Sequence, residues 1–148
     1  MNKLFVDSDI ILDVLTRRGE FYAPAAEIFD LAYAKELRLY TTAVVLANVF
    51  YLLRKKYGTE KSRECLKSLR LVMGVLPVTE KTIDEALLSG FADFEDGLQY
   101  FAAKENEILV IITRNVRDYR ERDLVVQTAG EYLDTLAWSG GDSGLPGS

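Results

Sequence analysis

Residues 108–119 read ILVIITRNVRDY, an unbroken apolar run followed by polar and charged residues. The five apolar residues at 108–112 are typical of a strand buried on both faces of a sheet. Shorter apolar runs of the same kind occur at residues 4–6, 38–41, 74–78 and, more weakly, 124–126. Stretches with helical signals lie between these runs. We therefore expect an α/β fold in which a short parallel sheet of four or five strands lies between two layers of helices.

Capping residues mark where the helices between those strands begin. Ser8 or Asp9 can cap the first helix, and Thr42 and Thr79 can cap two later ones, because short polar side chains accept hydrogen bonds from the first helical turn. Pro24 fits the first turn of the second helix. The expected helices span about residues 9–18, 24–35, 43–57, 59–71, 80–89, 93–105 and 129–137.

The size of the chain suits one domain. It has 148 residues, 49% of them hydrophobic, which is enough for a substantial core. We expect the domain to span residues 1–138, and the glycine-rich residues 139–148 to be a flexible tail or an artificial extension. The single cysteine, Cys65, cannot form an internal disulfide, and the N-terminus has no apolar signal segment. Both features favour a cytoplasmic protein with no membrane partner.

The sequence contains no histidine. This excludes Ser-His-Asp and Cys-His nucleophilic chemistry. It also excludes zinc sites that use imidazole, and ribonuclease chemistry that passes protons between two histidines. Any catalysis must therefore rest on carboxylates, hydroxyls, amines or a hard metal ion.

The net charge of −5 is unevenly distributed. Residues 54–70 carry a net charge of +5, so the remainder carries −10. This distribution has two interpretations, either ordinary solvated surfaces or a phosphate-binding surface beside an acidic centre.

Acidic residues occur where an open parallel sheet forms its sites. Asp7 directly follows the first expected strand, and Asp118 comes six residues after Ile112. Asp93 and Asp96 are three residues apart at the start of a helix and so share one face. Because ligands bind at the carboxyl ends of parallel strands, several of these carboxylates could meet at one edge of the sheet.

Clustered carboxylates repel one another unless a cation lies between them. Oxygen ligands favour Mg²⁺ or Mn²⁺ over zinc, and such an ion can activate water for attack on phosphorus. The alternative for Asp9 and Asp93 is a capping role, and the alternative for Asp13 is a solvated position on its helix.

Asn48 interrupts eleven otherwise apolar residues at 43–53. A buried amide needs a hydrogen-bond partner, because leaving it unpaired costs about 1–3 kcal/mol. Its partner is either a backbone group or the acidic site, where the amide would help to hold water or metal.

Four stretches, in this order, resemble the PIN domain, the nuclease fold shared with VapC-like toxins. The first resembles the family's opening strand with its first acidic residue, and the second resembles the third helix. The third resembles the helix with the third acidic residue, and the fourth has a Thr-x-Asn-x-x-Asp-aromatic pattern. They are FVDSDIILDVL (5–15), TTAVVLANVFYLLRK (41–55), DFEDGLQYFAA (93–103) and IITRNVRDY (111–119). The likeness covers residues 3 to about 136.

This resemblance implies a metal-dependent endoribonuclease that cuts RNA by metal-activated water. Asp7, Asp96 and Asp118 would be catalytic and would hold Mg²⁺ or Mn²⁺. The residues implied to support the site are Asn48, Asp93, Thr113 and Asn115. The residues expected to contact RNA are Arg54, Lys55, Lys56 and Arg114.

The resemblance also implies partners and one departure. VapC-like toxins act beside a small antitoxin protein, and homodimers are common in the family. Many PIN domains have a Glu where this chain has Asn48, so one negative charge is missing. This leaves open a non-catalytic PIN fold that binds RNA or regulates.

Two other enzyme classes place acids after strands. Asp7, Asp9 and Thr113 match parts of a haloacid-dehalogenase-type phosphatase, but that family needs a later Lys and none follows Thr113. A receiver domain needs an Asp after its third strand, where this chain has Pro77-Val78-Thr79. Neither pattern is complete.

Overall fold

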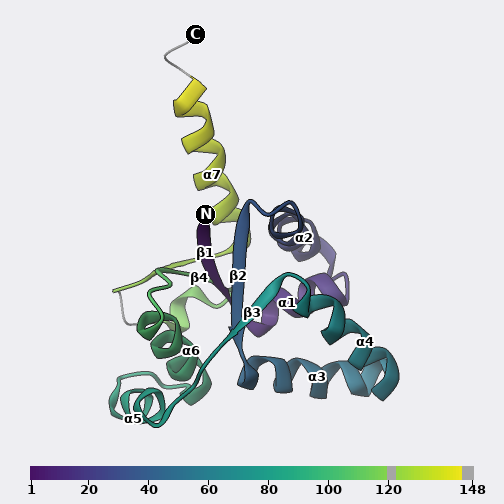
Figure 1. Ribbon diagram of the computed structural model, residues 1–148, viewed down its shortest axis with the longest axis vertical. Helices are drawn as coiled ribbons and strands as arrows, with labels where there is room; N and C mark the ends of the chain where they lie inside the picture. The colour runs from purple at the N-terminus through teal and green to yellow at the C-terminus, as the bar shows by residue number, and fades with distance from the viewer. Residues whose placement is uncertain (120–122, 145–148) are drawn as a thin grey trace.

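The computed structural model describes residues 1–119 and 123–144, the last six of these as backbone only, around a parallel sheet (Figure 1). Five strands form this sheet in the order β3-β2-β1-β4-β5. They are β1 (Asn2–Val6), β2 (Leu37–Thr42), β3 (Met73–Leu76), β4 (Val110–Ile112) and β5 (Val125–Gln127). All four neighbouring pairs are parallel. The predicted α/β fold and sheet are therefore confirmed.

Helices cover both faces of the sheet. Figure 1 shows α5 and α6 on one side and α1 to α4 on the other. The helices are α1 (Ser8–Leu15), α2 (Gly19–Tyr33), α3 (Ala43–Tyr57), α4 (Thr59–Arg70), α5 (Glu80–Leu88), α6 (Phe94–Glu105) and α7 (Ala129–Gly144), and a 3₁₀ turn spans Val116–Asp118. Within the described residues, no helix has the length and apolar character needed to span a bilayer.

The central strand β1 forms the middle of the hydrophobic core. Leu4, Phe5 and Val6 are fully buried, as expected for a strand with helices on both faces. Ile11 of α1 and Val49 of α3 pack in the same core. Each such side chain contributes about 1.5–3 kcal/mol on burial.

The predicted cap of the first helix is wrong. Asp7, not Ser8 or Asp9, caps α1, because its extended backbone lets its side chain accept from the Ser8 N–H. The caps predicted at Thr42 and Thr79 are present.

Two helices extend beyond the predicted bounds. The α2 helix begins at Gly19, so Pro24 lies in its second turn rather than its first, where its ring leaves the Glu20 carbonyl without a helical hydrogen bond. The α7 helix continues from the predicted end near Ala137 to Gly144, since glycine weakens a helix by about 1 kcal/mol but keeps its backbone donor. Residues 145–148 of the predicted tail lie outside the described residues.

The strand order creates a switch point between β1 and β4. From β1 the chain adds β2 and β3 on one side, whereas β4 and β5 lie on the other. Ligands of open α/β sheets bind at the carboxyl ends of strands where the order reverses in this way. Asp7 follows β1 there, and its N–H donates to the Ile112 carbonyl at 3.0 Å. Thr113 follows β4 beside it.

Candidate functional site

Asp7 lies at the switch point and is only 5% exposed. One carboxylate oxygen accepts a hydrogen bond from the Ser8 N–H at 2.7 Å. The other accepts from Thr113 Oγ1 at 2.9 Å and lies 3.1 Å from the Tyr119 hydroxyl. Burial raises the pKa of Asp7, and these donors oppose the rise. Asp7 is therefore a buried acid with a donor at each oxygen, as burial of a carboxylate requires.

Tyr119 connects Asp7 to α6. Its ring is fully buried and packs edge-on against Phe91, with 5.8 Å between the ring centroids. Its hydroxyl lies 3.0 Å from the side-chain oxygen of Gln99, a buried polar residue of α6. Burial, and then the charge of Asp7, raise the pKa of Tyr119 well above its usual value. The hydroxyl therefore remains a neutral donor.

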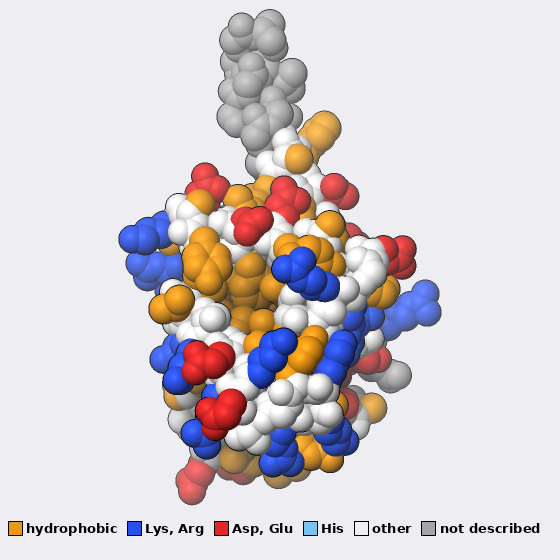
Figure 2. Space-filling model, turned by 90° about the vertical axis from the view of Figure 1, so that its right-hand side faces the viewer, with side chains coloured by type: hydrophobic (Ala, Val, Ile, Leu, Met, Phe, Trp, Pro, Cys, Tyr) orange, Lys and Arg blue, Asp and Glu red, His pale blue; other side chains and the backbone are white. Residues whose placement is uncertain are grey.

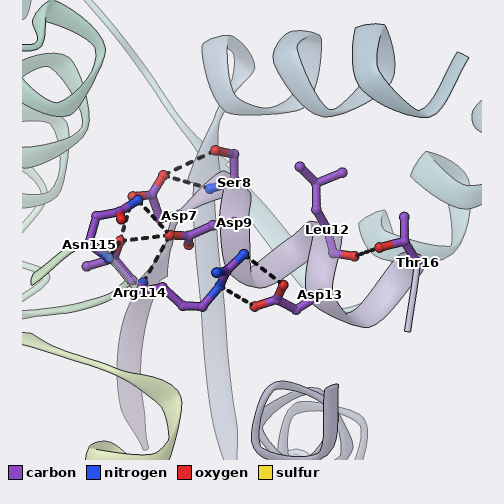
Figure 3. A network of polar contacts seen from close by, with 9 residues as sticks. Asp7, Ser8, Asp9, Leu12, Asp13, Thr16, Arg114 and Asn115 are labelled. Atoms are coloured by element: carbon purple, nitrogen blue, oxygen red, sulfur yellow. Dashed lines mark hydrogen bonds and ion pairs between the residues drawn. The ribbon is translucent and has the colours of Figure 1, made fainter. Parts of the chain in front are cut away.

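Asp9 faces the loop that follows β4 (Figure 3). Its Oδ2 accepts from the Arg114 N–H at 3.0 Å and from Asn115 Nδ2 at 3.1 Å, and it lies 3.3 Å from Thr113 Oγ1. Its Oδ1 is buried and has no hydrogen-bond partner among the residues that the structure describes. Burial, and then the charge of Asp7, raise the pKa of Asp9 to about 6.

Arg114 holds the same loop to α1 through its side chain. Its Nε and one terminal nitrogen donate to the two oxygens of Asp13 at 2.9 and 3.1 Å (Figure 3). The Asp13 side chain is 1% exposed, and that of Arg114 is 27% exposed. The guanidinium carbon also lies 4.2 Å from the ring centroid of Phe21. Burial raises the pKa of Asp13, and Arg114 opposes that rise.

Two further acids, Asp93 and Asp96, lie at the start of α6. Asp93 caps this helix by accepting a hydrogen bond from the Asp96 N–H at 3.0 Å. Asp96 is half-buried. Burial first, and then the charges of Asp7, Asp93, Asp118 and Asp9, raise the pKa of Asp96 to about 7. These five carboxylates therefore lie close enough for their charges to interact.

Asp118 and Asn115 come from the turn after β4. Asp118 ends the 3₁₀ turn, is exposed, and donates its N–H to the Asn115 carbonyl at 3.0 Å. The Asn115 N–H in turn donates to Thr113 Oγ1 at 3.1 Å. The turn thus places Thr113 and Asn115 against Asp7 and Asp9, and Asp118 follows at its end.

Asn48 reaches α6 rather than a backbone group. Its Nδ2 donates to Glu95 Oε2 at 2.9 Å, and the residue is half-buried. Because Glu95 precedes Asp96 on α6, Asn48 lies where α3 approaches the acidic cluster.

The predicted RNA-contacting residues fall into two groups. Arg54, Lys55 and Lys56 are exposed in the last turn of α3. Arg114 lies at the acidic site instead, with its guanidinium bound by Asp13.

The donor set fits a hard divalent cation. All the candidate ligand atoms are carboxylate or amide oxygens, which such cations prefer. The carboxylates repel one another without a cation. Asp9 also has a buried oxygen without a hydrogen-bond partner among the described residues. Among the described residues, no three acidic or cysteine side chains are yet close enough together to enclose an ion.

Sequence reasoning missed several of these contacts. It left open whether Asp9 only caps the helix and whether Asp13 is solvated, whereas the two acids, four residues apart on one helical face, both bind Arg114. Gln99 is a polar residue in the otherwise apolar stretch 97–103, and this signal could have identified it. Tyr119 occupies the aromatic position of the quoted pattern.

A sequence profile of the PIN domain matches residues 3–117. The chain belongs to the PIN domain family. The matched region includes Asp7, Asn48, Asp96 and Asn115. The family resemblance inferred from the sequence is therefore confirmed.

Among known proteins, this PIN domain is similar to Ribonuclease VapC1 of Aquifex aeolicus. The two are 26% identical over 137 residues, which cover 89% of this chain and 94% of the relative.

Solved structures share the PIN fold at lower identity. A toxin–antitoxin complex from Klebsiella pneumoniae superposes with a TM-score of 0.62 at 15% identity, covering 82% of this chain and 95% of the other. Mycobacterium tuberculosis VapC20, described as a toxin that cleaves the sarcin-ricin loop, superposes with a TM-score of 0.59 at 19% identity. That match covers 73% of this chain and 86% of the other. These likenesses concern the fold.

Proposed function

We propose that this PIN domain is a metal-dependent endoribonuclease of the VapC type. The observation that carries the proposal is the set of carboxylates around Asp7 at the sheet's switch point, where burial and then the charges of these acids raise the pKa of Asp96 to about 7. Carboxylates that are held together despite their burial and mutual repulsion are typical of a site that binds a cation. The similarity to Ribonuclease VapC1 supports RNA as the substrate.

The residues have distinct roles in this proposal. Asp7, Asp96 and Asp118 hold Mg²⁺ or Mn²⁺. When bound, such an ion activates water and stabilises charge on the phosphate group. Thr113 and Asn115 position the acids through hydrogen bonds. Arg54, Lys55 and Lys56 contact the RNA backbone. Arg114 instead holds the loop after β4 in place by its ion pair with Asp13.

Cleavage of a mixed RNA pool tests the proposal. The pool is incubated with Mg²⁺, Mn²⁺ or chelator, and the cut ends are mapped. We expect 5′-phosphate and 3′-hydroxyl ends with either metal and no cutting with chelator. Ends with a 2′,3′-cyclic phosphate would refute attack by water.

Variants of the acids test the site itself. Asp7→Asn and Asp96→Asn should each abolish cleavage and keep the fold, as judged by circular dichroism. Asp30→Asn, an exposed acid near the end of α2, is the matched control and should cut like the wild type. If either site variant keeps wild-type cleavage, the assignment is wrong.

A small antitoxin is the proposed protein partner, as in the Klebsiella toxin–antitoxin complex. An adjacent gene for a small protein that binds this chain and blocks cleavage would support it. We further propose a homodimer, which sedimentation of the purified chain tests.

A non-catalytic RNA-binding or regulatory module is the second candidate. The observation that favours it is Asn48, a neutral amide where many PIN domains have a Glu, whose side chain binds Glu95. A metal titration with a cleavage assay on structured RNA distinguishes the two, and Asn48→Glu tests whether position 48 belongs to the site. Tighter Mn²⁺ binding would place position 48 at the site, whereas binding of RNA without cleavage in any metal would favour the module.

A further inference from the structure

We propose that single-stranded RNA docks along one face of α3, with a base stacked on Tyr51 and phosphates on Arg54 and Lys55. We call the residues Asn48, Tyr51, Arg54 and Lys55 the Tyr51 surface. This inference rests on the proposed function, because it assigns a path to the RNA that the acidic site would cut.

The position of Asn48 connects the Tyr51 surface to the acidic site. Asn48 donates to Glu95, the neighbour of Asp96. Tyr51 and Lys55 follow Asn48 by three and seven residues, so all three share one helical face. At 1.5 Å per residue, they lie about 4.5 and 10 Å further along the axis. A strand that leaves the site along α3 therefore meets the tyrosine first and then the cations.

Tyr51 is presented as a stacking platform. It is 50% exposed. Lys55 Nζ lies over its ring, 4.3 Å from the centroid, and the Arg54 guanidinium carbon lies over it at 6.0 Å, so a base that stacks on this face displaces the cations toward its phosphates. Aromatic rings flanked by cations bind single-stranded nucleic acid without strong sequence preference, because every base has a stacking face.

A second tyrosine and further cations extend this chemistry along the helix. Lys56 and Lys61 lie 5.3 and 4.7 Å from the ring centroid of Tyr57 at the end of α3. Within the described part of the chain, none of Arg54, Lys55, Lys56 and Lys61 forms an ion pair. Their charges are thus available to phosphates. Figure 2, which faces the α2–α4 side, shows Lys and Arg side chains beside hydrophobic ones on this part of the surface.

Charge also argues for RNA rather than a second copy of this chain. A two-fold interface centred on Tyr51 would place two copies of the same positively charged surface against each other. Like charges brought together oppose such an interface, whereas a phosphate backbone complements them.

Binding of a fluorescein-labelled ten-residue oligouridylate in chelator tests the stacking. Anisotropy is measured in chelator so that cleavage plays no part. Tyr51→Ala should weaken binding by roughly tenfold, in the range measured for single stacked bases. Tyr51→Trp should retain it. Tyr33→Ala, which removes a 56% exposed tyrosine from α2, is the matched control and should bind like the wild type.

Salt dependence separates stacking from charge. Lys55→Ala should reduce the slope of log affinity against log salt by about 0.7, the value for one phosphate contact on a single strand. Tyr51→Ala should leave that slope unchanged. Lys81→Ala, a lysine of α5 paired with Glu85, should change neither the slope nor the affinity.

Three outcomes overturn the inference. The first is Tyr51→Ala binding as tightly as the wild type, and the second is Tyr33→Ala weakening binding equally. The third is a wild-type dimer that dissociates when Tyr51 is replaced, because the surface would then be a self-association interface. Loss of cleavage with retained Tyr51-dependent binding would instead refute only the proposed enzyme activity.

Discussion

The side chain of Arg114 forms two hydrogen bonds with Asp13, one helical turn beyond the acid that binds its backbone. The guanidinium contacts both Asp13 oxygens at 2.9 and 3.1 Å, while the Arg114 N–H donates to Asp9 at 3.0 Å. One residue of the loop after β4 therefore contacts two successive turns of α1. This attachment holds Thr113 and Asn115 against Asp7 and Asp9.

Asp13→Asn should destabilise the fold and loosen the loop. Removing one partner of a buried pair costs about 3–5 kcal/mol, and we expect about 2–3 kcal/mol here because Arg114 is partly exposed. Urea denaturation measures the loss. The double variant Asp13→Leu with Arg114→Leu should regain most of the stability but not the cleavage. A stable single variant would show that the ion pair does not hold the loop.

The stability contribution of Asp96 should depend on pH in the absence of metal. Its pKa is raised to about 7 in the folded protein, so the fold favours the protonated form. That stabilisation is complete below the unfolded pKa near 4 and is lost as pH rises through about 7.

The comparison of Asp96→Asn with the wild type measures this effect. In chelator at pH 8, the variant should melt about 2–4 °C higher, a shift equivalent to about 1 kcal/mol for a chain this long. At pH 5 the difference should shrink. An equal difference at both pH values would mean that the carboxylate is not under repulsion.

Divalent metal should stabilise the wild-type protein. An ion that binds only the folded state at a hundred times its dissociation constant adds about 2.7 kcal/mol. Thermal melts with Mn²⁺ and then chelator should show a reversible increase in Tm. Asp7→Asn should lose this increase and Asp30→Asn should keep it. Equal shifts in all three proteins would indicate binding elsewhere.

Tyr119→Phe should weaken the site without unfolding the domain. The change removes the hydroxyl near Asp7 and Gln99 and leaves the Gln99 side chain without this partner. We expect the free energy of unfolding, measured by urea denaturation, to fall by about 1–2 kcal/mol, because a buried polar group loses its hydrogen bond. Mn²⁺ affinity should fall as well, since Asp7 loses a donor that orients it. Unchanged metal affinity would limit Tyr119 to a structural role.

Local patterns predicted most of the fold. The apolar runs that became β1 and β4 are continuous because helices cover both faces of the sheet. Thr42 and Thr79 mark helix starts because their side chains accept hydrogen bonds from the first helical turn. The weaker predictions concerned helix lengths, such as that of α7. There the cost of a glycine is small compared with the backbone bonds that continue the helix.

The site was predictable in part. Sheet topology and spacing made Asp7, Asp93 and Asp96 candidates, because they follow a strand or begin a helix, whereas the choice of Asp96 over Asp93 came from the resemblance to the PIN domain. The pairing of Asp13 with Arg114 joins residues 101 positions apart, and no local pattern encodes such a contact. The same holds for Asn48 and Glu95, which meet only because α3 and α6 converge.

The central place of β1 has a consequence for the order of folding. Its neighbours are β2, which follows closely in the sequence, and β4, which begins at Val110. During synthesis, β1 can pair with β2 long before β4 exists, and distant pairings form slowly because a long loop must close. Asp7 acquires Thr113 and Tyr119 only after that closure. A nascent or truncated chain that ends before residue 113 thus carries the first acid without the groups that orient it.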